Sequence, residues 1–163
     1  DRRQARYLGV PAGDVVRAIA AYKAPAMRQQ MVEANGLLII DDSYNASPDS
    51  MRSAIDVLST RPVTGKRAAV LADMLELGDF SQQGHYQVGQ YAKERGVELL
   101  VAVGPLSREI AAGYGEGARW FATNQEASAF LRDALRPGDA VLVKGSRGMK
   151  TDEIVAVLSA VSP

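Results

Sequence analysis

Short apolar runs without alternation recur along the chain, and segments with apolar residues at helical spacing separate them. Such a run is typical of a strand that helices cover on both faces. Strands are predicted in this way over residues 37–41, 67–72, 99–103, 119–121 and 140–144. Helices are predicted over residues 13–22, 48 to near 62, 82–95, 106–114, 124–135 and 151–161. Strands that alternate with helices imply right-handed parallel crossovers, so the pattern predicts an α/β protein, a three-layer α/β/α Rossmann-like sandwich with a mostly parallel sheet.

The first of these strands has a hairpin partner at its N-terminal side. Residues 28–34 precede Asn35-Gly36, a pair that supplies the two positive φ angles of a type I′ turn. We therefore expect residues 28–34 to form an antiparallel edge strand.

Residues 36–48 carry this strand into two acids and a polar turn. Asp41 and Asp42 stand at the carboxyl end of the strand, which is where open α/β sheets collect ligands. One of the two carboxylates could accept hydrogen bonds from ribose hydroxyls or hold a cation, and the other could cap the next helix. Ser47 suits an N-cap and Pro48 the first helical turn. The stretch predicts a strand, a ligand-facing turn and a helix.

Three more polar loops follow strands that would end at the same edge. They contain Asp73 with Glu76, residues 104–107, and residues 145–150. Each loop alone is typical of a solvated turn, but their density on one edge favours a site. The last loop fails the Walker pattern because Met149 stands where a glycine must precede the lysine. It still offers Arg147 and backbone N–H groups near a helix start, which suit a carboxylate or a phosphate as well as a plain loop.

Composition narrows the classes of function. The 163 residues carry 19 Lys and Arg against 19 Asp and Glu, and this balance gives no reason to expect nucleic acid or a membrane surface as partner. Cysteine is absent and no signal peptide is evident, which is compatible with a reducing cytoplasm, and we expect a cytoplasmic protein. We also expect a monomer, although the sequence carries no signal for the oligomeric state. We assign no metal site, because His85 lacks a second His or Cys and is expected at the surface or in packing. Trp120 and Phe121 are expected in the core.

Three motifs in order carry a resemblance to a known family. They are Asp-Asp-Ser-Tyr-Asn-Ala-Ser-Pro-Asp-Ser-Met at 41–51, Asp-Met-Leu-Glu-Leu-Gly at 73–78 and Val-Lys-Gly-Ser-Arg-Gly-Met-Lys at 143–150. On these motifs the chain resembles the C-terminal domain of the Mur ligases from about Arg28 onward. Residues 1–27 then resemble the tail of the family's central ATPase domain, and residues 28–163 the C-terminal domain.

The resemblance implies an ATP-dependent amide ligase of peptidoglycan precursor synthesis. Its motifs are most similar to those of the branch that joins D-alanyl-D-alanine to UDP-MurNAc-tripeptide through an acyl phosphate. In this family the central domain holds the phosphate loop and Mg²⁺, so we expect the fragment alone to be inactive. The resemblance implies ATP contacts from Arg28, Asp42, Tyr44 and Asn45. It implies a D-Ala-D-Ala pocket bordered by Asp73, Ser107, Gly145, Ser146 and Arg147, and no catalytic residue in the fragment.

Two departures from the family pattern stand out. Ala72 occupies a position where the family usually has glycine, which should change little because alanine is small. Ala26-Met27 stands where a glycine usually lies near Arg28, so the register of Arg28 is open.

Other readings of the same residues remain. A phospho-receiver module would use Asp41-Asp42 and Lys144, but it needs an aspartate where the chain has Val103-Gly104-Pro105. A non-catalytic nucleotide-binding domain is a second alternative. The folylpolyglutamate and cyanophycin branches of the ligase family are a third, against which the Asp-Ser-Tyr-Asn-Ala motif favours the D-Ala-D-Ala branch.

Overall fold

The structure, a computed structural model, describes residues 29–161. Its strands are β1 Gln30–Ala34, β2 Leu37–Asp42, β3 Arg67–Ala72, β4 Leu99–Val103, β5 Arg119–Phe121 and β6 Ala140–Lys144. Its helices are α3 Pro48–Thr60, α4 Ser81–Glu94, α5 Arg108–Tyr114, α6 Asn124–Ala134 and α7 Asp152–Ser159. Short 3₁₀ turns lie at Gly78–Phe80 and Arg147–Met149.

The described strands form one sheet in the order β1-β2-β6-β3-β4-β5. Every neighbouring pair is parallel except β1 and β2, which form the antiparallel hairpin. Asn35 and Gly36 have φ values of 54° and 79°, as the type I′ turn requires. The predicted mostly parallel sheet with an antiparallel edge strand is confirmed, and β6 is found inserted between β2 and β3.

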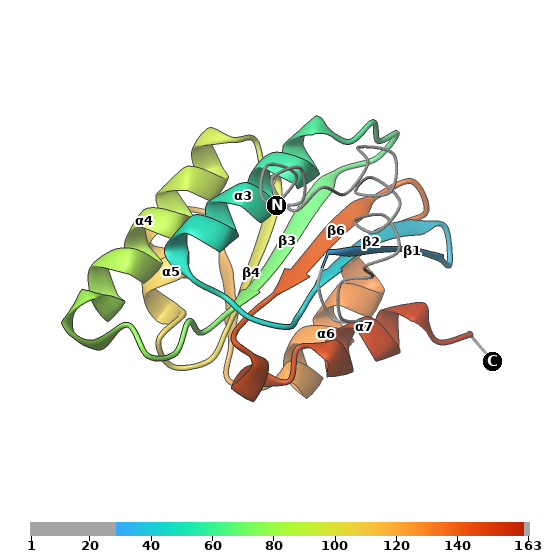
Figure 1. The fold of residues 1–163 in the computed structure, drawn as a ribbon. Helices are drawn as coiled ribbons and strands as arrows, with labels where there is room; N and C mark the ends of the chain where they lie inside the picture. Colours follow the sequence, from blue (N-terminus) through green and yellow to red (C-terminus); the bar gives the residue numbers. More distant parts are fainter. Residues whose placement is uncertain (1–28, 162–163) are drawn as a thin grey trace, which may run out of the picture.

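Helices cover both faces of the sheet (Figure 1). Alternate residues of β2 divide between two cores: Ile40 packs with α3, α4 and α5, and Ile39 packs with α6 and α7. The strands are apolar on both faces because neither face meets water. This explains why the strand positions could be found from unbroken apolar runs.

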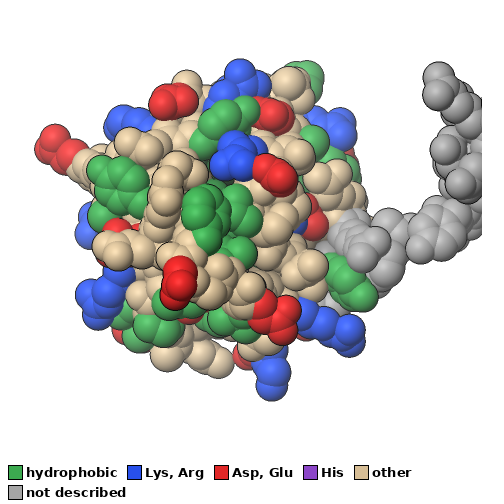
Figure 2. Space-filling model, turned by 60° about the vertical axis from the view of Figure 1, so that its left-hand side comes forward, with side chains coloured by type: hydrophobic (Ala, Val, Ile, Leu, Met, Phe, Trp, Pro, Cys, Tyr) green, Lys and Arg blue, Asp and Glu red, His purple; other side chains and the backbone are tan. Residues whose placement is uncertain are grey.

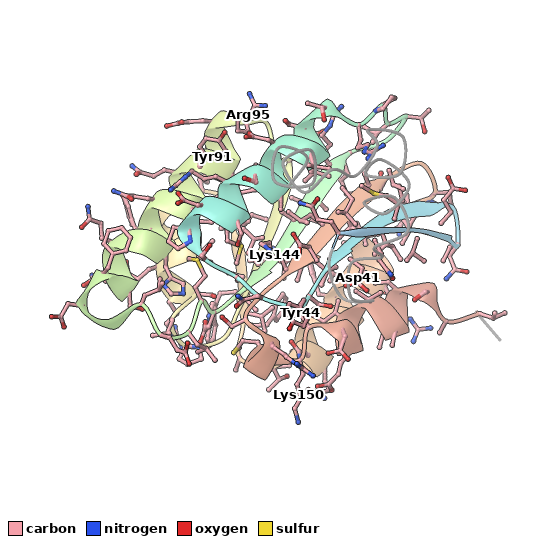
Figure 3. All side chains as sticks on the ribbon, viewed as in Figure 1. Asp41, Tyr44, Tyr91, Arg95, Lys144 and Lys150 are labelled. Atoms are coloured by element: carbon pink, nitrogen blue, oxygen red, sulfur yellow. The ribbon has the colours of Figure 1, made fainter. Side chains whose placement is uncertain are left out.

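Helix α4 packs closely on α5. A Cβ at Gly89 would lie 2.0 Å from the carbonyl oxygen of Ile110, and a Cβ at Gly113 would lie 2.0 Å from that of Tyr86. The two glycines therefore let the helix backbones touch. On the other side of α4, Tyr91 donates to Asp56 of α3 at 2.5 Å and Arg95 lies 3.0 Å from the same carboxylate (Figure 3).

The ends of several elements differ from the prediction. Arg28 and the helix predicted at 13–22 lie outside the described residues. Helix α5 begins at Arg108, because the preceding residues form a turn in which Ser107 N–H donates to the Gly104 carbonyl. Helix α6 has Thr123 as its N-cap, whose Oγ accepts from the N–H of Glu126. The expected cap Asn124 instead donates to the Met149 and Lys150 carbonyls.

Candidate functional site

The four polar loops meet at the carboxyl-end edge of the sheet, as the sequence predicts. Strands β2, β6, β3 and β4 are successive parallel neighbours, so the loops that follow them lie side by side. Figure 3 shows Asp41, Tyr44 and Lys144 near the ends of β2 and β6. The site is built on strand ends that the hydrogen-bonded sheet holds in register.

Asp42 forms a buried ion pair at this edge. Its Oδ2 lies 2.9 Å from Nζ of Lys144, and the two residues are register partners on β2 and β6. Lys144 Nζ also donates to the Asn45 carbonyl at 2.9 Å. Sequence reasoning did not assign Lys144 to the site, although a lysine that ends an apolar strand was a usable signal.

Asp41 points to the opposite face of the sheet, since side chains alternate along a strand. Its Oδ1 accepts from the N–H and Oγ of Ser43, at 3.3 and 2.6 Å. Burial raises the pKa of the Asp41 carboxyl, and nearby Asp152 and Asp42 act in the same direction, against the lowering effect of the bonds from Ser43. The two neighbouring acids therefore have separate environments.

A cavity of about 630 Å³ opens beside Asp42, within the range of small-ligand sites, about 300–1,000 Å³. Its walls carry hydroxyl, amide, carboxylate and ammonium groups. They come from Gln29, Asp42, Asn45, Ser47, Ser50, Ser53 and Lys144. Asp41 is not among them. Such walls suit a ligand that offers several hydroxyl groups.

The start of α3 shapes one wall of this cavity. Ser47 is the N-cap, its side chain accepts from Ser50 N–H, and Ser50 Oγ accepts from Ser47 N–H. Pro48 occupies the first turn. The predicted cap is confirmed, and this capping box fixes both serines at the cavity.

Asp73 joins the loops after β3, β4 and β6. Its carboxylate accepts from Leu106 N–H at 3.2 Å and from the N–H and Oγ of Ser107, both at 2.8 Å. Its carbonyl accepts from Ser146 N–H at 3.0 Å, and Ser146 Oγ accepts from Leu75 N–H at 2.8 Å. Asp73, Ser107 and Ser146 are buried, so their hydrogen bonds hold the three loops together beneath the exposed surface of the site.

Two glycines permit this close approach of the loops. A Cβ at Gly145 would lie 2.7 Å from that of Ala72, so the alanine that departs from the family pattern rests directly against it. Gly104 has φ +105°, and a Cβ there would lie 2.6 Å from Asp73 Oδ1. Larger residues at either position would push the loops apart.

Arg147 is the exposed member of the predicted dipeptide group. Its guanidinium lies 5.5 Å from the centre of the half-buried Tyr44 ring, a cation–π distance. The contact joins a residue predicted at the nucleotide to one predicted at the dipeptide, so the two predicted groups are neighbours.

His85, Trp120 and Phe121 differ in how deeply they are buried. His85 is fully buried, its Nε2 accepts from Met74 N–H at 2.9 Å and its Nδ1 lies 2.6 Å from the Ser81 carbonyl. Its predicted packing role is therefore found, not a surface role. Trp120 and Phe121 are only half-buried against the two cores, and Trp120 stacks with Arg108, 3.6 Å from the ring centre. Both residues belong to β5, an outermost strand, which pairs only with β4 in the described sheet.

Residues 29–161 hold neither a cluster of metal-ligating side chains nor a membrane-spanning helix. No group of three or more His, Cys, Asp and Glu side chains comes together as a metal site in that range. None of its helices has the length and apolar character needed to cross a membrane. On the face seen in Figure 2, acidic, basic and hydrophobic side chains are mixed.

The chain is similar to known proteins over most of its length. A family model described as Mur ligase, glutamate ligase domain, matches residues 27–147. A UDP-N-acetylmuramoyl-tripeptide--D-alanyl-D-alanine ligase of Bacillus subtilis is 32% identical over an alignment of 155 positions, which covers 91% of this chain and 34% of the relative. The enzyme of that name in Escherichia coli is 38% identical over 127 residues, 77% of this chain and 27% of the relative. The chain thus spans about a third of the length of these curated relatives.

The chain is also similar in structure to solved proteins of this kind. A crystal structure of MurF from Acinetobacter baumannii has a TM-score of 0.82 at 32% identity, over 95% of this chain and 35% of that one. MurF from Thermotoga maritima in complex with ADP has a TM-score of 0.79 at 27% identity, over the same 95% and 35%. A bifunctional folylpolyglutamate synthase/dihydrofolate synthase from Yersinia pestis shares the fold. It has a TM-score of 0.65 at 19% identity, over 88% of this chain and 34% of that one.

Proposed function

The chain belongs to the Mur ligase family, and we propose that it is the C-terminal domain of the ATP-dependent, ADP-forming ligase that adds D-alanyl-D-alanine to UDP-MurNAc-tripeptide. The observation that carries this proposal is the cavity of about 630 Å³ beside Asp42, to which the first of the three family motifs contributes Asp42, Asn45, Ser47 and Ser50. Relatives with the corresponding name, and a solved relative in complex with ADP, support the choice of reaction and nucleotide.

On this proposal the cavity holds the ribose of ATP. The Asp42 carboxylate accepts hydrogen bonds from ribose hydroxyls, and bonds of this kind to a charged acceptor are stronger than neutral ones. Asn45 lines the same cavity, and Tyr44 flanks the nucleotide from the adjoining turn. Arg28, which lies outside the described residues, would reach the phosphates.

The loops tied together by Asp73 border the dipeptide. Ser107, Gly145 and Ser146 fix the shape of this surface, and Arg147 offers a guanidinium to the dipeptide carboxylate. The reaction needs the dipeptide amine held in line with the acyl phosphate carbonyl, because orientation supplies much of the rate in such a transfer. The loops supply that orientation.

The remaining parts of the reaction belong to other domains of the longer protein. We propose that residues 1–27 end a central ATPase domain, which holds the phosphates and Mg²⁺, and that residues 28–163 close over the nucleotide. Mg²⁺ would neutralise charge on the transferred phosphoryl group when bound there. The ligase would act in the cytoplasm as a monomer without nucleic acid.

The test is ligation by the full-length enzyme that contains this chain. ADP release should require both D-alanyl-D-alanine and UDP-MurNAc-tripeptide, and mass spectrometry should find the UDP-MurNAc-pentapeptide. Residues 1–163 alone should release no ADP. ADP release with L-glutamate and a folate, but not with D-alanyl-D-alanine, would instead place the chain in the folylpolyglutamate branch.

A further inference from the structure

We propose that Lys144 is a positioning residue for the nucleotide: it holds the Asp42 carboxylate and the turn after β2 in the arrangement that receives the ribose. This inference rests on the proposed function, since it takes Asp42 as the ribose acceptor. Lys144 makes no contact with the transferred group on this proposal and acts through Asp42.

The ammonium group of Lys144 bridges two points of the same turn. Its Nζ lies 2.9 Å from Asp42 Oδ2 and donates to the Asn45 carbonyl at 2.9 Å. The two contacts span the turn that contains Ser43 and Tyr44. One side chain from β6 therefore fixes both the start and the end of the turn.

Lys144 contacts one of the two oxygens of the Asp42 carboxylate. Within the described part of the chain, the Oδ1 atom of Asp42 takes part in no hydrogen bond, and both Asp42 and Lys144 line the cavity. A carboxylate held by one oxygen cannot rotate freely, so its other oxygen has a fixed direction. This is the preorganisation that a hydroxyl-binding acceptor needs.

The burial of the pair makes Lys144 necessary for this geometry. The side chains of Lys144 and Asp42 are 3% and 8% exposed. A buried carboxylate without its cation is strongly disfavoured, and it turns toward water. This change would remove the oriented acceptor from the cavity.

A second ion pair in the chain serves as a matched control. Lys66 Nζ lies 2.6 Å from Asp139 Oδ2 and donates to the Ala134 carbonyl, so it also bridges a carboxylate and a backbone oxygen. Lys66 and Asp139 flank the amino ends of β3 and β6, at the edge opposite the cavity. Removal of Lys66 tests the loss of such a pair without a change at the site.

The experiment compares ATP with 2′,3′-dideoxy-ATP, which lacks both ribose hydroxyls, in the full-length enzyme. The readout is the ratio of kcat/KM for the two nucleotides. We expect Asp42→Ala to lower this ratio by about tenfold or more, the value of a hydrogen bond to a charged group. Lys144→Met should lower it by a similar factor, and Lys66→Met should leave it unchanged.

The double variant Asp42→Ala/Lys144→Met carries no unpaired buried charge and so keeps the test open if Lys144→Met alone fails to fold. Its ratio should equal that of Asp42→Ala, because the ratio reports only on the ribose hydroxyls, which on this proposal bond to the Asp42 carboxylate and not to the part of the turn that Lys144 holds through the Asn45 carbonyl. A further fall in the double variant, or a wild-type ratio in a folded Lys144→Met, overturns the positioning role while the ribose assignment stands. A wild-type ratio in Asp42→Ala removes the ribose assignment and the role of Lys144 together.

Discussion

Ser107 donates two hydrogen bonds to the Asp73 carboxylate, from its N–H and its Oγ, both at 2.8 Å. The bonds cross from the loop after β4 to the loop after β3, and the Asp73 carbonyl continues the connection to Ser146 after β6. Three loops of the candidate site are thus joined through one aspartate. A change at Asp73 should therefore disturb all three loops, which are the proposed dipeptide side of the sheet edge.

Asp73→Ala should raise the KM for D-alanyl-D-alanine by about tenfold or more and change the KM for ATP little, because two buried donors of Ser107 lose their acceptor. Steady-state kinetics of the full-length ligase measure both constants. Ser107→Ala removes only the Oγ bond and should give a smaller effect in the same direction. Equal increases in both KM values would argue against a separate dipeptide side.

Gly89→Ala should destabilise the fold by about 2 kcal/mol or more, since the new methyl would lie 2.0 Å from the Ile110 carbonyl oxygen and force α4 and α5 apart. Alanine is otherwise the better helix former, by about 1 kcal/mol. Gly84→Ala in the same helix is the control, because its Cβ would meet only side-chain atoms of Leu77 and Phe80 at 3.2 Å or beyond. Urea unfolding of both variants compares them, and similar stabilities would contradict the close helix contact.

Ser47→Ala should cost about 1 kcal/mol of stability, because it removes the N-cap of α3. Thr123→Ala removes the N-cap of α6 and should cost about as much. The two variants should differ in function, since Ser47 lines the cavity and Thr123 does not. Only Ser47→Ala should raise the KM for ATP, and an equal rise in both would mean that the kinetic effect follows stability alone.

Asp139→Asn should destabilise the protein at pH 7 and lose this effect in acid. Burial opposes ionisation of Asp139, but the Lys66 ammonium and the N–H groups of Arg136 and Lys66 outweigh it and lower the pKa of the carboxyl. A lowered folded-state pKa stabilises the fold above the unfolded value of about 3.9, and the contribution disappears as the pH falls through the folded-state pKa.

Urea unfolding of the wild type and Asp139→Asn between pH 7 and pH 3 measures this. The difference in stability should shrink below about pH 4. Exposed Asp49, paired with Arg52 one helical turn away, provides the control, and Asp49→Asn should have a small effect throughout. A pH-independent difference for Asp139→Asn would contradict a role of its charge.

The elements of this fold could be predicted because each carries a local signal. The strand Arg67–Ala72 is a buried apolar run, and its predicted bounds match the structure at both ends. Asn35-Gly36 determines the hairpin of β1 and β2 through the backbone preferences of these two residues. The start of α6 has no unique local signal, because Thr123 and Asn124 are both good caps. Only the contact of Asn124 with the carbonyls after β6 separates the two.

The site could be predicted as an edge but not as a set of pairs. Any parallel sheet would bring Asp42 and Asp73 to the same edge. That Lys144 faces Asp42 depends on β6 lying next to β2, and no local pattern encodes the order of strands. The partner of His85 could not be predicted either, because Met74 lies in the loop after β3 and only the folded structure brings the two together.

The insertion of β6 between β2 and β3 also sets the order in which the site can come into existence as the chain folds. The hairpin of β1 and β2 is local, but it joins the rest of the sheet only through β6, the last strand along the chain. Contacts between segments so distant in sequence form slowly, because a long loop must close first. Asp42 therefore gains its lysine only when β6 pairs with β2, and nucleotide binding by this domain would report that pairing.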